Sequence, residues 1–231
     1  MKKTIAMCCA LGLAASVAFA ALSNDEVKRL SESATILSEL RASPDKGIPE
    51  ELWEKAQCVL VIPSMKRAAF VVGGEYGSGV MSCRRPTGWS APVFMQLAKG
   101  SWGLQIGAEQ IDLVLLAMNQ TGVNKLLQDK VSLGADASVA AGPVGRAASA
   151  ATDAQLNAEL LSYSRSQGLF PGIDLSGGVL KPDKEADARA YGEGVTAREV
   201  IEGPKKVDMP SQASVFIRAL GRDVRATTGH K

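Results

Sequence analysis

The side chains that most often carry out catalysis are scarce in this chain of 231 residues. Its one histidine, His230, is the penultimate residue, where chain ends are commonly frayed. The body of the chain therefore has no Ser-His-Asp triad, Cys-His pair or histidine metal site. Beyond the first twenty residues the only cysteines are Cys58 and Cys83, too few for a structural zinc site. We expect neither a metal nor a cofactor.

Two carboxylates are the remaining candidates for catalysis. Asp112 lies within the apolar run IDLVLLAM, and Asp136 lies in the small-residue run GADASVAAGPVG. An acid–base pair of the two would indicate a hydrolase. The alternative is a structural buried acid at Asp112, which needs a partner, and an exposed turn at Asp136. The candidate partners are four arginines near glycine or small residues: Arg84, Arg85, Arg146 and Arg165.

The glycine-rich stretch from Gly73 to Gly79 is superficially similar to a nucleotide-binding loop. It lacks the Lys-Ser/Thr that ends a P-loop, and it leads into SGVMSC rather than into a helix. Phosphate-binding loops depend on a helix N-terminus behind them. We predict a tight connection between two strands here.

The first twenty residues have the features of a secretory leader. Lys2 and Lys3 precede an uncharged apolar stretch that ends in Ala-Phe-Ala, a typical signal-peptidase site. A retained anchor is the alternative, although the alanine, glycine and serine content makes it a weak one. The sequence predicts a signal peptide at 1–20 and a single periplasmic domain at 21–231.

Export changes both the charge and the redox setting. Without Lys2 and Lys3 the basic and acidic residues are equal in number, which argues against nucleic acid as a partner and against bulk attraction to anionic lipid. Cys58 and Cys83 are then left in an oxidising compartment and form a candidate disulfide, which would stabilise the fold by about 3–4 kcal/mol. The alternative is that Cys58, within CVLVI, is a small buried hydrophobe.

The clearest element is an amphipathic helix over 23–41, which begins with a capping box of Ser23 and Glu26. Its apolar face consists of Val27, Leu30, Ala34, Leu37 and Leu40. This face would contact lipid if the helix lay on a membrane, with Lys28 and Arg29 towards the headgroups. The alternative is that it packs on its own domain, because the helix has no basic excess and no Trp or Phe anchor.

The whole chain has 46% hydrophobic and 22% charged residues and is too apolar for disorder. Beyond the 23–41 helix the sequence predicts an α+β fold. Short apolar runs between glycines and prolines predict strands of a curled, mostly antiparallel sheet or barrel-like core. These runs are CVLVI, AAFVV, SGVMSC, PVFMQL, SWGLQI and IDLVLLAM, followed by strand-like stretches at 133–140, 156–164 and 169–180. Peripheral helices are predicted at 49–56, 119–129, 184–191, 196–201 and 211–220.

Several motifs together resemble a known family. They are KAQCVLVIP, GEYGSGVMSCR, GWSAPVFMQLAKGSWGLQIGAEQIDLVLLAMN, LGADASVAAGPVGR and SYSRSQGLFPGIDLSGGVL. Their order and spacing resemble the SYLF lipid-binding domain family, also known as the Ysc84-like actin-binding family, over nearly all of the chain after the leader. The pair GPVGR and SYSRSQGLF is the most specific part of this resemblance.

The resemblance implies a non-enzymatic domain. Eukaryotic members bind phosphoinositide-containing membranes, partly through an amphipathic segment that corresponds to the 23–41 helix, and a fungal branch binds actin. Bacterial members are exported. Arg146 and Arg165 are the candidates for headgroup contact, because guanidinium forks suit phosphate. We therefore expect a periplasmic phospholipid-binding or phosphatidylinositol-binding protein, peripheral on a membrane, with an interaction module for an envelope protein as the alternative. The sequence leaves the oligomeric state open.

Overall fold

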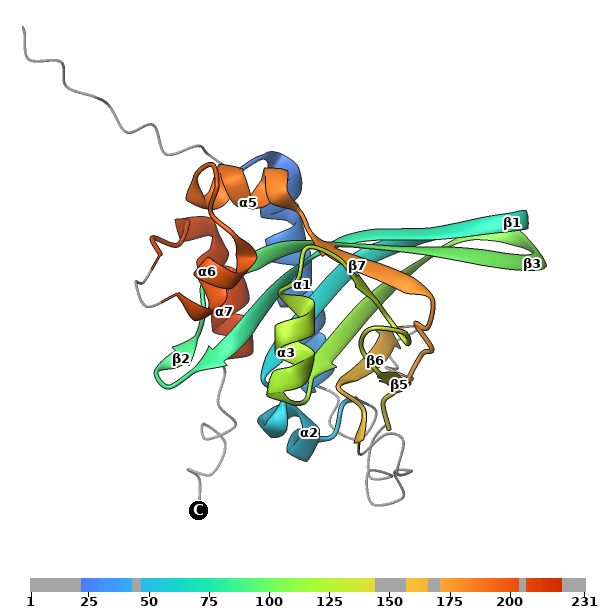
Figure 1. Cartoon of the computed structure of the whole chain (residues 1–231), viewed down its shortest axis with the longest axis horizontal. Helices are drawn as coiled ribbons and strands as arrows, with labels where there is room; N and C mark the ends of the chain where they lie inside the picture. Colours follow the sequence, from blue (N-terminus) through green and yellow to red (C-terminus); the bar gives the residue numbers. More distant parts are fainter. Residues whose placement is uncertain (1–21, 43–46, 144–156, 166–170, 204–206, 222–231) are drawn as a thin grey trace, which may run out of the picture.

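The computed structural model describes residues 22–42, 47–143, 157–165, 171–203 and 207–221 (Figure 1). At 41, 68–72 and 101–109 it describes the backbone alone. Two long strands, β1 (Cys58–Arg85) and β3 (Val93–Ala117), dominate the fold. They pair antiparallel, from Cys58 opposite Ala117 to Met81 opposite Val93.

Five shorter strands extend this ribbon into a sheet. β2 (Gly88–Trp89) lies in the connection between the long strands. β6 (Leu160–Arg165) and β7 (Gly178–Pro182) pair with separate parts of β3. β4 (Val131–Ser132) pairs with β7, and β5 (Val139–Ala141) lies parallel to β6.

The β1–β3 ribbon is folded over on itself, so that the two halves of β1 lie against each other. The Arg84 amide donates to the Gln57 carbonyl at 2.7 Å, although Gln57 immediately precedes the strand and Arg84 lies near its end. Glycine permits the close contact, because a Cβ on Gly79 would lie 2.1 Å from the Val61 carbonyl oxygen. Register shifts interrupt the pairing at 62/65 and 69/71, and such irregularities bend strands.

The middle of the ribbon projects away from the helices, towards the right of Figure 1. We call this projection the arm and define it as residues 66–76 of β1 and 98–110 of β3. The residues that flank it are buried, among them Met65, Leu97 and Ile111. β7 pairs with β3 only up to Lys99, and β6 only from Asp112 onward. Within the described sheet, residues 100–110 of β3 therefore pair with β1 alone, so this part of the arm is a ribbon of two strands without a third.

Alternate residues of the ribbon enter two hydrophobic cores, as the period of a strand requires. Leu60 and Ile62 belong to a core closed by α3 (Gln120–Leu126) and α6 (Ala197–Glu202). Val59 and Val61 belong to a core with α1, α2, α5 and α7. The bounds of these and the remaining helix are α1 Asn24–Ala42, α2 Glu50–Lys55, α5 Lys184–Tyr191, η2 Ser211–Ala213 and α7 Ser214–Leu220.

The α+β class and the curled, mostly antiparallel sheet are confirmed. The N-terminal helix is confirmed too, with its capping box: the Ser23 amide donates to Glu26 at 2.6 Å, and the Glu26 amide donates to the Ser23 hydroxyl at 3.3 Å. The helices near 184, 196 and 211 also form. The leader at 1–20 lies outside the described residues and stays a prediction.

Two expectations about strands are wrong. The tight connection expected from Gly73 to Gly79 does not exist, because these residues continue β1 without a turn. Similarly, the six short runs are not six strands but parts of β1 and β3. The stretches at 133–140, 156–164 and 169–180 contribute only short strands, β5 to β7, and irregular chain.

Candidate functional site

The apolar face of α1 lies inside the domain. Leu30 and Leu37 are 0% exposed and Leu40 is 3% exposed, since the helix packs on β1 and α7. Val27 is half-buried. In the folded domain these side chains contact protein, so the expected contact with lipid would require α1 to leave the body.

Two ion pairs also hold the start of α1 on α5. Arg29 Nη1 lies 2.7 Å from Asp183 Oδ2, and Arg189 Nε donates to Glu26 Oε1 at 2.7 Å. Glu26 is fully buried. Lys28 is exposed and lies 3.8 Å from Glu32 on the same helix. Of the two basic residues expected to face headgroups, only Lys28 faces solvent.

A third carboxyl, Asp187, completes a buried acidic cluster with Asp183 and Glu26. It is 1% exposed; Oδ1 accepts a hydrogen bond from the Phe94 amide at 2.8 Å, and Oδ2 has no partner among the described residues. The pKa of Asp187 is raised to about 7, chiefly by burial and also by the charges of Asp183 and Glu26, while the hydrogen bond from the Phe94 amide opposes the rise. The carboxyl is therefore protonated in mildly acidic solution.

This raised pKa predicts a pH-dependent stability. The unfolded chain releases the Asp187 proton near pH 4 while the folded chain keeps it until about pH 7, so the contribution of Asp187 to stability falls over that window. Asp187→Asn removes the titration. We expect the wild type to lose roughly 2 kcal/mol relative to this variant between pH 5 and pH 8, as measured by urea unfolding. An equal difference at both pH values would contradict the assignment.

The structure brings Asp112 together with Arg165. Arg165 Nη1 lies 3.2 Å from Asp112 Oδ2, and its Nη2 lies 2.6 Å from Glu39 of α1. The other oxygen of Asp112 accepts from the Ser64 amide at 2.8 Å. These contacts are those of a structural ion pair, although the Asp112 side chain is partly exposed rather than fully buried as expected. Arg165, expected at a headgroup, holds two carboxylates instead.

The other residues of the proposed hydrolase and headgroup sites lie elsewhere. Asp136 is exposed and accepts from the Ser132 amide at 2.7 Å, a bond that holds its pKa below the usual range. A carboxyl of that kind is a poor general acid. Arg146 lies outside the described residues. The described geometry gives the expected Asp112/Asp136 acid–base pair no support.

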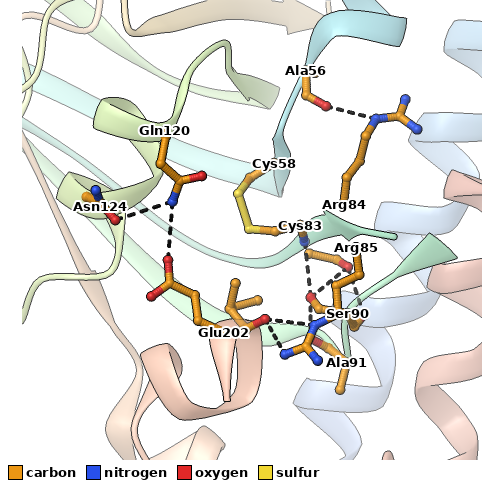
Figure 2. The surroundings of a disulfide bond; sticks show 12 residues. Ala56, Cys58, Cys83, Arg84, Arg85, Ser90, Ala91, Gln120, Asn124 and Glu202 are labelled. Atoms are coloured by element: carbon orange, nitrogen blue, oxygen red, sulfur yellow. Dashed lines mark hydrogen bonds between the residues drawn. A yellow bond between two sulfur atoms is a disulfide. The ribbon is translucent and has the colours of Figure 1, made fainter. Parts of the chain in front are cut away.

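A disulfide joins Cys58 to Cys83, which confirms the candidate bond (Figure 2). The two adjacent arginines, also expected as partners of a buried acid, bind backbone carbonyls instead. Arg84 donates to Ala56 at 2.9 Å and stacks over Trp89, and Arg85 donates to Ile201 at 2.8 Å. Both side chains therefore bind carbonyls at the C-terminal ends of α2 and α6, next to the disulfide, and do not form a charged site.

Described residues line two cavities of note, and Asp187, whose pKa is raised, is among the residues that line the larger one. One of about 680 Å³ lies between α5 and α6, beside Leu127, Val195 and the exposed ion pair of Lys184 with Asp129. A smaller one, of about 280 Å³, adjoins the disulfide. The described residues include no group of three or more side chains that could hold a metal ion. They also include no helix long and apolar enough to cross a bilayer.

The arm is the surface feature that sequence reasoning missed. Tyr76, which is 50% exposed, is the exposed large hydrophobic residue of the described chain. Lys66 is exposed nearby, and Lys99 is half-buried and donates to the Asp174 carbonyl at 3.0 Å. Arg67 Nε lies 2.9 Å from Glu75 Oε1 across the fold of the ribbon. The sequence does carry a signal for the arm, because residues 68–74 and 100–108 contain no charged side chain.

Together these features define a single α+β domain around a folded-over β-ribbon, with its N-terminal helix docked on the body. A family model described as "Ysc84: Las17-binding protein actin regulator" matches residues 98–223. The chain therefore belongs to the Ysc84 family, and the resemblance seen in the motifs is confirmed. The description of this family names an actin regulator and no enzymatic activity.

Curated relatives agree with this assignment. The chain is 34% identical over 180 residues to LAS seventeen-binding protein 3 of Saccharomyces cerevisiae, covering 76% of this chain and 39% of that protein. It is 35% identical over 201 residues to SH3 domain-containing YSC84-like protein 1 of Xenopus laevis, covering 86% of this chain and 58% of that protein. The chain thus spans between about two fifths and three fifths of the length of these relatives.

Proposed function

We propose that this chain is an exported bacterial protein that binds the phospholipid surface of an envelope membrane and catalyses no reaction. The leader predicted at 1–20 supports a periplasmic location. Family membership supports a binding role over an enzymatic one. The single observation that carries the proposal is the arm, a projecting ribbon with an exposed tyrosine and exposed lysine at its base.

The residue types on the arm favour a membrane as the partner. Tyrosine is enriched at bilayer interfaces, where its ring is at the level of the headgroups. The arm has three basic and two acidic residues, and one acid, Glu75, already pairs with Arg67. The remaining positive charge suits anionic lipid phosphates at short range, although the chain without its leader is neutral overall.

The arm replaces the N-terminal helix in this proposal. The face of α1 formed by Leu30, Leu37 and Leu40 already stabilises the core, and freeing it would expose three large apolar side chains at about 2 kcal/mol each. The headgroup role proposed for Arg165 would likewise compete with Asp112 and Glu39. Regulation of actin belongs to the described family, and a periplasmic protein has no access to that partner.

Vesicle co-sedimentation tests the function. We expect the full-length chain, expressed in a bacterium that can process the leader, to sediment with vesicles of phosphatidylethanolamine and phosphatidylglycerol. A fraction should remain bound at about 0.5 M salt, because apolar contact is not screened. Vesicles that contain phosphatidylinositol test the headgroup preference implied by the family.

The matched control is centrifugation of the protein without vesicles. A chain that stays in the supernatant at both salt concentrations would contradict the proposal. It would favour an interaction module, which a pull-down dominated by one envelope protein would identify.

A further inference from the structure

The far end of the arm is a charge-free segment on both strands. We call it the arm end and define it as residues 68–74 of β1 and 100–108 of β3. The pairing of Ala68 with Ala108 and of Gly74 with Gly100 places the two segments side by side. Between them they contain six large apolar residues: Phe70, Val71, Val72, Trp102, Leu104 and Ile106.

The arm end has a definite reach. Arg67 and Glu75 are in contact at 2.9 Å. The seven residues of β1 between them must therefore run outward from this ion pair and back to it. Half of that path, at about 3.3 Å per residue, extends the arm end about 13 Å beyond the ion pair. The headgroup layer is about 5–8 Å thick on each side of a bilayer. The reach is enough to pass the headgroups and enter the first part of the acyl chains.

The backbone limits how deep the arm end can go. A ribbon of two strands leaves amide and carbonyl groups unpaired along its outer edges, and such groups are not tolerated deep in hydrocarbon. These edges need water or headgroups within reach. A shallow position satisfies both requirements, with the tip of the ribbon among the upper acyl chains and its edges near the interface.

The base of the arm matches the chemistry of a lipid interface. Lys66, Tyr76 and Lys99 surround the arm end, and lysine and tyrosine are typical anchors at the level of the headgroups. Two acidic residues, Glu75 and Glu109, also lie at the base, and Glu75 pairs with Arg67. The net positive charge that remains favours anionic lipid phosphates as the partner.

We infer that the arm end inserts shallowly into the outer acyl region of a phospholipid bilayer, with Lys66, Tyr76 and Lys99 among the headgroups. This inference rests on the proposed function and names the element and the depth of the contact. It assigns membrane contact to the fold of the β1–β3 ribbon, far along the chain from α1.

Depth-dependent quenching of Trp102 tests the inference. Trp53 is buried and Trp89 stacks on Arg84, so a Trp102→Phe variant gives the matched background from the other two tryptophans. The probes are phosphatidylethanolamine–phosphatidylglycerol vesicles brominated near the headgroup end or near the middle of the acyl chain. We expect stronger quenching by the shallow bromines in the wild type, and loss of that excess in Trp102→Phe.

A charge placed in the arm end gives a second, independent test. We expect Ala69→Asp to weaken vesicle binding by about tenfold or more. The matched control is Ala135→Asp, which adds the same charge at an exposed turn and should change binding by about twofold at most. Thermal unfolding of both variants shows whether the domain remains folded; if Ala69→Asp is unfolded, the quenching result decides alone.

The outcomes separate the two proposals. Vesicle binding without quenching of Trp102, and with equal binding by Ala69→Asp, would overturn the inference that the arm end inserts. The proposed function would still stand. No vesicle binding by the wild type would overturn both. A lipid-free dimer that Ala69→Asp dissociates in analytical ultracentrifugation would show a second copy on the arm end and would also overturn the inference.

Discussion

Replacing both Cys58 and Cys83 with alanine is expected to lower the free energy of unfolding by about 3–4 kcal/mol. The bond joins residues 25 apart in sequence, and a cross-link of that span removes conformational freedom chiefly from the unfolded chain. It also ties the start of β1 to its end. Without the bond, the folded-over ribbon would depend on packing, on the Arg67–Glu75 ion pair and on the hydrogen bonds that Arg84 donates to carbonyls near the start of β1.

Urea unfolding of the oxidised wild type and the double variant measures this effect. Reductant supplies the control, because it should bring the wild type close to the variant and leave the variant unchanged. A loss below about 1 kcal/mol would contradict the account, since it would mean that the ends of β1 stay together without the bond.

Gly79→Ala is expected to cost about 3 kcal/mol of folding free energy. The added methyl would lie 2.1 Å from the Val61 carbonyl oxygen and 2.9 Å from Ile62 Cα. These are backbone atoms, so no side-chain rotation can relieve the clash. The two halves of β1 would have to separate where they pack against each other.

Gly100→Ala is the matched control, because it is the same substitution in the paired strand β3. A Cβ at Gly100 would meet nothing within 4 Å, and alanine should leave stability within about 0.5 kcal/mol of the wild type. Thermal unfolding of the two variants side by side measures the contrast. Equal effects would contradict the close approach of the two halves of β1 at Gly79.

The sequence predicted the parts of the fold that depend on local chemistry. The capping box of Ser23 and Glu26 marks the start of α1 within one residue. Cys58 and Cys83 are the two cysteines left once the predicted leader is set aside, and this indicated their bond. The long strands could not be predicted, because glycines such as Gly77 usually weaken strands and mark turns. Here Gly77 and Gly79 serve a long-range contact that no local pattern shows.

The candidate site was predicted less well, for a related reason. Periodicity shows that α1 has an apolar face, but it does not show whether protein or lipid covers that face. In the structure Leu30 and Leu37 pack into the domain. Arg84 and Arg85 were expected to pair with a buried acid, yet they bind carbonyls at the ends of neighbouring segments. Which carbonyls these arginines bind depends on which helix ends the fold brings next to β1.

The emission of Trp102 during a titration with brominated phospholipid vesicles is the most direct test of the central claim, that this domain meets a membrane through its arm. The account predicts quenching that grows with vesicle binding, is stronger for bromines near the headgroups, and is absent from Trp102→Phe. Binding that leaves the Trp102 emission unchanged would contradict it.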